Sequence, residues 1–216
     1  MADLEAEKAR SEALLRNVLP ERIIERLNNG EASISDRFDD VAVLFTDLVS
    51  FTEMSAISDP AVVVGTLNAL FSRFDQLSVD LGVEKIKTIG DAYMAAAGLL
   101  EHRDDHIDAA VRMGIGMLAA LEDVNTVRGS TWSMRVGIHA GPVMAGIIGT
   151  RKYVYDVWGD TVNTASRLQT TAPPGTVHLT RAVAERLDPA AFIVEGHDAL
   201  ELRGLGVVET CRVRLR

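Results

Sequence analysis

The sequence is poor in cysteine, in positive charge and in long apolar runs. A single cysteine, Cys211, excludes an internal disulfide and gives no cysteine spacing for a metal site, which fits a reducing compartment. Acidic residues outnumber basic ones by 31 to 22 without a clustered basic surface, so we expect no nucleic-acid partner. No segment resembles a membrane span or a signal peptide. These absences predict a cytoplasmic chain, or the cytosolic part of a membrane-anchored protein.

The apolar content is sufficient for one substantial core preceded by a helical arm. With 216 residues, of which 47% are hydrophobic, one domain is favoured over two. Residues 3–27 are mostly helix formers. An interrupted heptad spacing is visible at Leu4, Ser11, Leu15, Val18 and Arg22. We therefore divide the chain into an N-terminal helical arm, residues 1–35, and a domain, residues 36–216; for the arm, a packing helix and a dimerising coiled coil both stay open.

The remaining pattern alternates between strands and helices. The run from Val41 to Phe45 is continuously apolar, which is typical of a strand covered on both faces. A polar loop follows, and Asp59-Pro60 begin a helix that continues to about Val79. A hairpin, a helix and a strand come next, over residues 83–89, 92–97, 105–121 and 131–140. The C-terminal part adds a strand, a helix, a turn and short strands, over residues 153–158, 161–170 and 173–175 and around 177, 202 and 208. The sequence therefore predicts an α/β (α+β) fold with a ferredoxin-like βαββαβ core, a β-rich C-terminal part and the N-terminal arm.

Two aspartates are predicted to lie together beside the central strands. Asp47 comes directly after the first buried strand, and Asp91 lies in the turn of the hairpin. Two carboxylates combined with substrate phosphates are ligands that typically hold Mg²⁺. Each aspartate alone fits an ordinary strand end or turn equally well, so the interpretation depends on the pair.

Other polar groups could bind a phosphate-bearing ligand. The backbone N–H groups of residues 48–52, between a strand and a helix, could cradle phosphate oxygens, although the segment lacks the glycines of a P-loop. Asn163 and Arg167 are four residues apart on a predicted helix, so they share one face, and Asp156 lies on the strand leading into it. The alternative is that Arg167 forms a surface salt bridge and Asn163 is solvated.

Four segments together resemble the class III nucleotidyl cyclases. They are Phe45–Thr52, Lys85–Met94, Arg135–Val143 and Asp156–Arg167. The resemblance extends from about Asp36 to the C-terminus, and four motifs in the family's order are far more specific than any short pattern. The arm resembles the signalling helix that precedes the catalytic domain in bacterial receptor-type cyclases, which implies that membrane or sensor domains can lie upstream.

The resemblance implies a role for each motif residue. The metal ligands would be Asp47, Asp91 and the Leu48 carbonyl, holding two divalent ions, Mg²⁺ or Mn²⁺. The phosphate contacts would be the Phe51 and Thr52 amides, Arg135, and Arg203, which stands where the family has a lysine. Asn163 and Arg167 would orient the ribose and stabilise charge at the reacting phosphorus. The adenine contacts would be Lys87, Asp156, Phe45 and Ile89.

Hydrogen-bond polarity then predicts the base. Lysine only donates and aspartate only accepts, so Lys87 suits adenine N1 and Asp156 suits the N6 amino group. Guanine reverses both demands, at a cost of about 1 to 3 kcal/mol per unsatisfied group. The guanylate branch of the family typically has glutamate and cysteine at these positions. We therefore expect an adenylate cyclase that converts ATP to cyclic AMP and pyrophosphate.

The resemblance also implies a homodimer with two composite sites. In the family, the metal aspartates and the base-reading residues of one site come from opposite subunits, and this chain carries both sets. A guanylate cyclase and a catalytically silent nucleotide-binding regulator are the alternatives. A diguanylate cyclase is disfavoured, because the hairpin reads Ile89-Gly90-Asp91-Ala92 and lacks that family's Gly-Gly-Asp/Glu-Glu-Phe turn.

Overall fold

The N-terminal part of the chain places one short helix beside the sheet. The computed structural model describes residues 7, 10, 15, 18–31, 33–100, 103–149 and 153–216. About half of the segment of helix formers over residues 3–27, including the heptad positions Leu4 and Ser11, lies outside the described residues. Helix α2 (Glu21–Asn28) begins after Pro20, whose carbonyl oxygen accepts a hydrogen bond from the Ile24 backbone N–H at 3.1 Å. Ile23 and Ile24 are buried, so α2 packs onto the domain.

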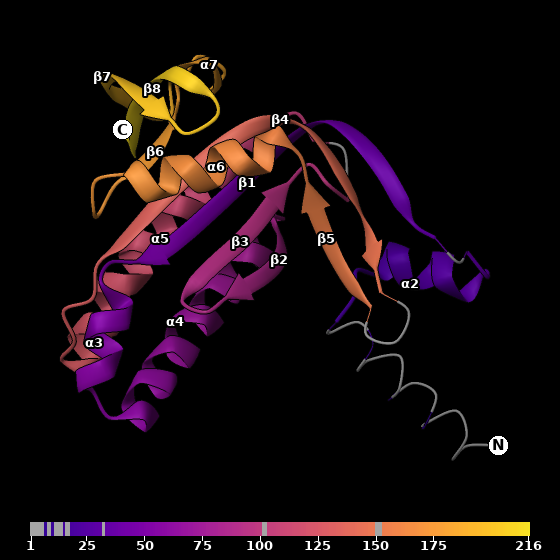
Figure 1. Cartoon of the computed structure of the whole chain (residues 1–216), viewed down its shortest axis with the longest axis horizontal. Helices are drawn as coiled ribbons and strands as arrows, with labels where there is room; N and C mark the ends of the chain where they lie inside the picture. The colour runs from indigo at the N-terminus through magenta and orange to yellow at the C-terminus, as the bar shows by residue number, and fades with distance from the viewer. Residues whose placement is uncertain are drawn as a thin grey trace.

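Eight strands of the described chain form one sheet in the order β2-β3-β1-β4-β6-β8-β7, with β5 paired to β4 (Figure 1). The strands are β1 (Ser35–Leu48), β2 (Glu84–Ile89), β3 (Ala92–Ala97), β4 (Met134–Ile148), β5 (Val154–Trp158), β6 (Val177–Thr180), β7 (Phe192–Leu202) and β8 (Gly206–Leu215). Strand β1 is central and antiparallel to both β3 and β4. This sheet, with helices after β1 and β3, confirms the predicted α+β class and its βαββαβ core.

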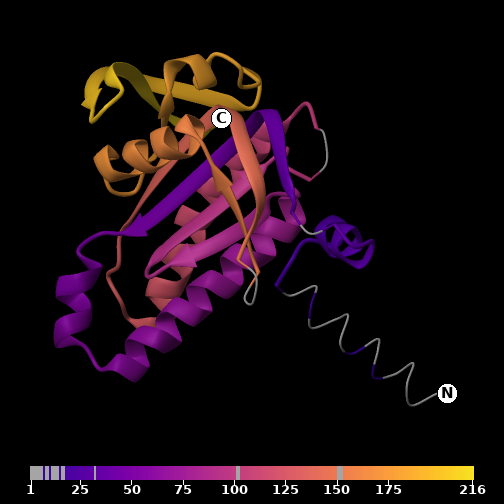
Figure 2. The same cartoon turned by 45° about the vertical axis from the view of Figure 1, so that its right-hand side comes forward.

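Helices cover both faces of the sheet. The helices after α2 are α3 (Phe51–Ile57), α4 (Pro60–Leu81), α5 (His106–Arg128), α6 (Asp160–Thr171) and α7 (Arg181–Ala184). Figures 1 and 2 show α4 and α5 on one face and α6 on the other, lying across β1 and β4. Among the described residues, no helix combines the length and the apolarity that crossing a bilayer requires.

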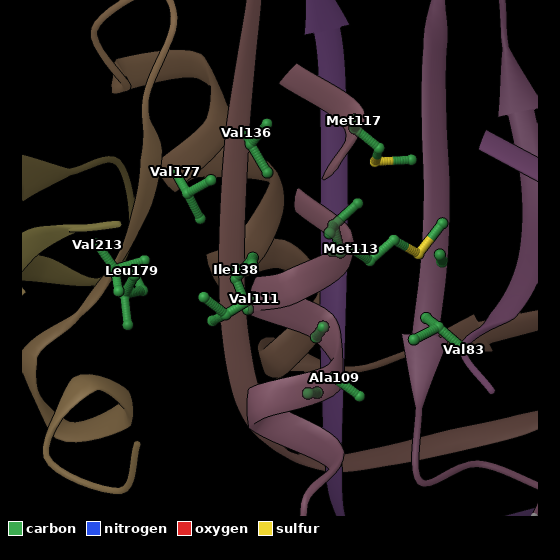
Figure 3. Packing of buried hydrophobic residues seen from close by; sticks show 14 of the residues in the cluster. Val83, Ala109, Val111, Met113, Met117, Val136, Ile138, Val177, Leu179 and Val213 are labelled. Carbon is green, nitrogen blue, oxygen red and sulfur yellow. The ribbon is translucent and has the colours of Figure 1, made fainter. Parts of the chain in front are cut away.

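The continuous apolar run in β1 is explained by two cores, one on each face. Leu44 packs with α4 and α5, whereas Val43 and Phe45 belong to the cluster on the α2 and α6 side. Figure 3 shows part of the first cluster, in which Val111 and Met113 of α5 and Ile138 of β4 are all buried. Because successive strand residues face opposite sides, a strand between two cores needs an apolar residue at every position.

Several elements are longer than the sequence predicts, or are missed by it. Strand β4 continues eight residues past Ala140 to Ile148, because its second half pairs with β5 and with the start of β1. Pro142 lies opposite a register shift in β1, a position where a strand tolerates proline. Helix α3 replaces the expected polar loop; it buries none of its residues and so has no apolar period. Strands β7 and β8 form a long hairpin instead of short strands.

Candidate functional site

Two carboxylates meet at the end of β1, as the sequence predicts. Asp47 is next to last in β1, and Asp91 lies in the β2–β3 turn, where Gly90 has a positive φ of 64°. Asp91 Oδ2 accepts a hydrogen bond from the Leu48 backbone N–H at 3.2 Å. The pKa of Asp47 is raised, first by burial and then by the negative charge of Asp91, while the charge of Arg135 opposes the rise. The β2–β3 turn therefore holds Asp91 close to the like charge of Asp47.

This pair fits a divalent cation that completes its shell with other ligands. Asp47 and Asp91 repel each other, and a cation between them would relieve that repulsion. Both provide hard oxygen donors, and the Leu48 carbonyl is adjacent in the chain. No group of three or more His, Cys, Asp or Glu residues in the described ranges could hold a metal by itself. The arrangement suits ions that keep waters and phosphate oxygens as ligands.

The segment after β1 turns sharply into helix α3. Ser50 adopts the left-handed conformation, with φ 54°, directly before the helix begins at Phe51. The Phe51 ring meets Trp132 edge-on, with centroids 6.0 Å apart, which holds the start of α3 against the segment before β4. First-turn amides of a helix have no intrahelical acceptor, so those of Phe51 and Thr52 can donate to a ligand.

Helix α6 lies unusually close to β4 and carries the predicted catalytic pair. A Cβ added at Gly137 would lie 2.1 Å from the Gln169 nitrogen, so only glycine permits this approach. Asn163 is exposed, and Arg167 is half-buried. The Arg167 guanidinium lies 3.6 Å from the Cβ position of Gly204, in the β7–β8 turn. Arg203 precedes that glycine, so the turn brings the two arginines into one region.

The predicted base-reading pair forms an ion pair. Lys87 Nζ of β2 contacts Asp156 Oδ2 of β5, although 69 residues separate them in the sequence. The other carboxylate oxygen, Oδ1, accepts a hydrogen bond from the Val157 backbone N–H at 2.8 Å. The Asp156 side chain is 14% exposed and that of Lys87 is 33% exposed, so a ligand can reach the pair at the surface of the sheet edge. Phe45 is buried, whereas Ile89 is 54% exposed.

The geometry thus groups the predicted residues into three places. The first contains Asp47, Asp91 and Arg135, which lies opposite Asp47 in the β1–β4 register. The second contains Lys87 and Asp156, and the third combines the outer side of α6 with the β7–β8 turn.

One residue beside Asp47 is missed by the sequence analysis. Gln169 of α6 is 7% exposed, and its amide opposes the rise in the pKa of Asp47. The sequence does contain one sign of this burial: Gln169 is a polar residue on the same side of the helix as the apolar residues Ala165 and Leu168. A buried amide at this position indicates contact with something polar on the sheet.

Comparison with known proteins points to one family. The chain matches the family model described as the adenylate and guanylate cyclase catalytic domain over residues 34–214. It is 41% identical over 210 residues to an adenylate cyclase of Mycobacterium tuberculosis (strain ATCC 25618 / H37Rv), covering 97% of this chain and 47% of that protein. It is 36% identical over 208 residues to guanylate cyclase soluble subunit beta-2 of Rattus norvegicus, covering 96% of this chain and 30% of that protein. The chain spans less than half the length of these curated relatives.

The fold agrees with a solved cyclase domain as well. The guanylate cyclase domain of RhGC from Catenaria anguillulae, crystallised in complex with GTP, superposes with a TM-score of 0.79 and 32% identity, covering 84% of this chain and 99% of that one. Both adenylate and guanylate cyclases are therefore among the relatives, and the comparisons leave the choice of nucleotide open. The four motifs, the sheet order and these matches together identify the chain as a member of the class III nucleotidyl cyclases, within the adenylate and guanylate cyclase catalytic domain family.

Proposed function

We propose that the chain is an adenylate cyclase that converts ATP to 3′,5′-cyclic AMP and pyrophosphate. The observation that carries this choice is the ion pair between Lys87 and Asp156. It places one donor and one acceptor side by side, as adenine N1 and the N6 amino group require. In the orientation that the family implies, with Lys87 at N1 and Asp156 at the 6-substituent, guanine would oppose both groups. A guanylate cyclase is therefore the alternative that these two residues disfavour.

We assign the phosphate chemistry to residues at the end of β1 and on α6. Asp47, Asp91 and the Leu48 carbonyl hold two divalent cations, Mg²⁺ or Mn²⁺, which when bound lower the pKa of the ribose 3′-hydroxyl and neutralise the leaving pyrophosphate. The phosphates are bound by the Phe51 and Thr52 amides, Arg135 and Arg203. Asn163 orients the ribose, and Arg167 stabilises the charge that develops when the 3′-oxygen attacks the α-phosphorus.

We propose a homodimer with two shared sites as the active form. Exposed apolar side chains lie along the hairpin of β4 and β5; they are Met144, Ile148, Tyr153 and Val154, exposed by 40%, 60%, 44% and 50%. An apolar surface of this kind favours association. The same proposal divides the chain into an arm, residues 1–35, and a catalytic domain, residues 36–216. It also places the protein in the cytoplasm, where ATP is present and where the buried free thiol of Cys211 stays reduced.

Mixing two inactive variants tests the proposal. Asp47→Ala and Lys87→Ala chains are each expected to be inactive with ATP or GTP in the presence of Mn²⁺. After equal amounts exchange subunits, half of the dimers are mixed and each has one complete site, so about one quarter of wild-type activity should return, with ATP as the preferred substrate. Product identity is measured by mass spectrometry. Faster turnover of GTP than of ATP would contradict the adenylate assignment, and a wild-type protein inactive with both nucleotides would indicate a silent regulator.

A further inference from the structure

Gln169 is a buried polar side chain to which the proposed chemistry assigns no role. Its backbone rests directly on β4 at Gly137. Arg135 is two residues from Gly137 on the same strand, so the two positions share one face of the sheet. Arg135 also lies opposite Asp47 in the β1–β4 register. The Gln169 carboxamide is therefore held over the strand positions that carry the proposed metal aspartate.

Two buried N–H donors lie near the Asp47 carboxylate. Arg135 Nε and Gln169 Nε2 are both buried, and neither has a hydrogen-bond partner of good geometry within the described part of the chain. Arg135 is the register partner of Asp47, and Gln169 rests on the same face of β4 two residues from Arg135, so both donors lie beside that aspartate. An unpaired buried donor is costly, because it has lost its water partners without gaining another acceptor. Hydrogen bonds from these donors to Asp47 would remove that cost and would also restrict where its second oxygen points.

We propose that Gln169 is a positioning residue for the metal site of its own chain. Its Nε2–H donates to one carboxylate oxygen of Asp47 and leaves the other oxygen for the cation. Gln169 and Arg167 are two residues apart, which separates them by about 200° around the helix. Helix α6 thus presents Arg167 to the nucleotide on its outer side and fixes Asp47 on its inner side. This inference rests on the proposed function and adds a residue to its metal site.

Mixed dimers distinguish this role from general damage to α6. In the mixture described above, the complete site takes Asp47 from the Lys87→Ala chain. We expect Gln169→Met in that chain to lower the activity of the mixture about 10- to 100-fold, the range seen when the outer partner of a metal ligand is removed. Methionine keeps the length of the side chain and removes its donor. The loss should be confined to the chain that supplies Asp47; an equal loss from either chain, or no loss from either, would overturn the proposal.

A binding measurement tests the same residue without turnover. Binding of Mn²⁺ to the wild-type and Gln169→Met proteins is followed by electron paramagnetic resonance with 3′-deoxy-ATP, which lacks the attacking hydroxyl. We expect the dissociation constant for Mn²⁺ to rise about 10- to 100-fold in the variant. An unchanged constant would overturn the positioning role. If the mixture without Gln169→Met is inactive, the shared-site proposal fails, while the Mn²⁺ measurement still decides the role of Gln169.

A matched control is available on the surface of α4. The Gln76 amide donates to the Asp80 carboxylate at 2.8 Å and is exposed to solvent. Gln76→Met removes a glutamine–aspartate contact of the same chemistry, on a helix to which we assign no catalytic or binding residue. It should change neither the activity of the mixture nor the Mn²⁺ constant. A loss comparable to that of Gln169→Met would show that the substitution itself is harmful and would overturn the interpretation.

Discussion

Replacing Gly137 by alanine tests whether the close approach of α6 to β4 supports both stability and activity. The added Cβ would lie 2.1 Å from the Gln169 nitrogen, 2.5 Å from the Ala165 carbonyl oxygen and 2.7 Å from the Gln169 Cα. All three atoms are backbone, so no side-chain rotation relieves the clash and the helix must move. Overpacking of this kind costs about 3 kcal/mol, the upper part of the usual range. For a domain of this size, that cost lowers the melting temperature by about 6 to 12 °C.

The same variant should also lose most of its activity at temperatures where it is still folded. Helix α6 carries Asn163 and Arg167, and displacements of about 1 Å in catalytic groups reduce turnover about 100-fold. The assays are urea unfolding followed by circular dichroism, and ATP turnover below the melting temperature. Gly65→Ala in α4 is the matched control, because the nearest atom to its added Cβ is Arg128 Nη1 at 3.8 Å. It should raise stability by about 0.5 to 1 kcal/mol. A Gly137→Ala protein with wild-type unfolding and wild-type turnover would refute this account of the α6 contact.

Three further outcomes follow from the charges of the site and of the core. Asp47→Asn should raise the melting temperature measured without metal at pH 7, and it should abolish ATP turnover measured with Mn²⁺. The reason is that burial and Asp91 raise the pKa of Asp47, so its ionised form destabilises the fold above that pKa; a lower melting temperature would contradict this. Burial lowers the pKa of His178, so the unfolded chain binds more protons and stability falls as the pH drops below about 6.5; His178→Leu should flatten that slope in urea titrations, and an unchanged slope would exclude His178 as its source. The double substitution Lys87→Glu with Asp156→Cys should shift preference from ATP toward GTP, because both hydrogen-bond polarities change; a retained ATP preference would show that other residues select the base.

The fold was predictable where a short stretch of sequence is compatible with only one kind of structural environment. The apolar run from Val41 to Phe45 indicated a strand covered on both faces, and two cores indeed enclose it. Asp59-Pro60 marked the start of α4, where the Asp59 side chain accepts a hydrogen bond from the Ala61 backbone N–H at 2.7 Å. Helix α3 has no buried residue, so no periodicity could reveal it. The length of β4 depends on partners that are distant in the sequence, which local patterns do not contain.

The candidate site was predictable as a set of motifs, but its contacts were not. Lys87 and Asp156 were expected to address one base, and the structure adds that they pair directly within one chain. Gln169 escaped notice because a single glutamine in a helix carries no distinctive spacing. Its position became informative only through Gly137, whose missing side chain allows the amide to reach the sheet beside Asp47. Polar contacts formed by close packing of elements are therefore visible only in three dimensions.

A crystal structure of the protein with Mn²⁺ and 3′-deoxy-ATP tests the central claim most directly. The account predicts a two-fold dimer in which Asp47 and Asp91 of one protomer ligate cations on the triphosphate. Lys87 and Asp156 of the other protomer should lie within hydrogen-bonding distance of adenine N1 and the N6 amino group. A nucleotide whose triphosphate lies away from both aspartates, or whose base is held by residues other than this pair, would contradict the account.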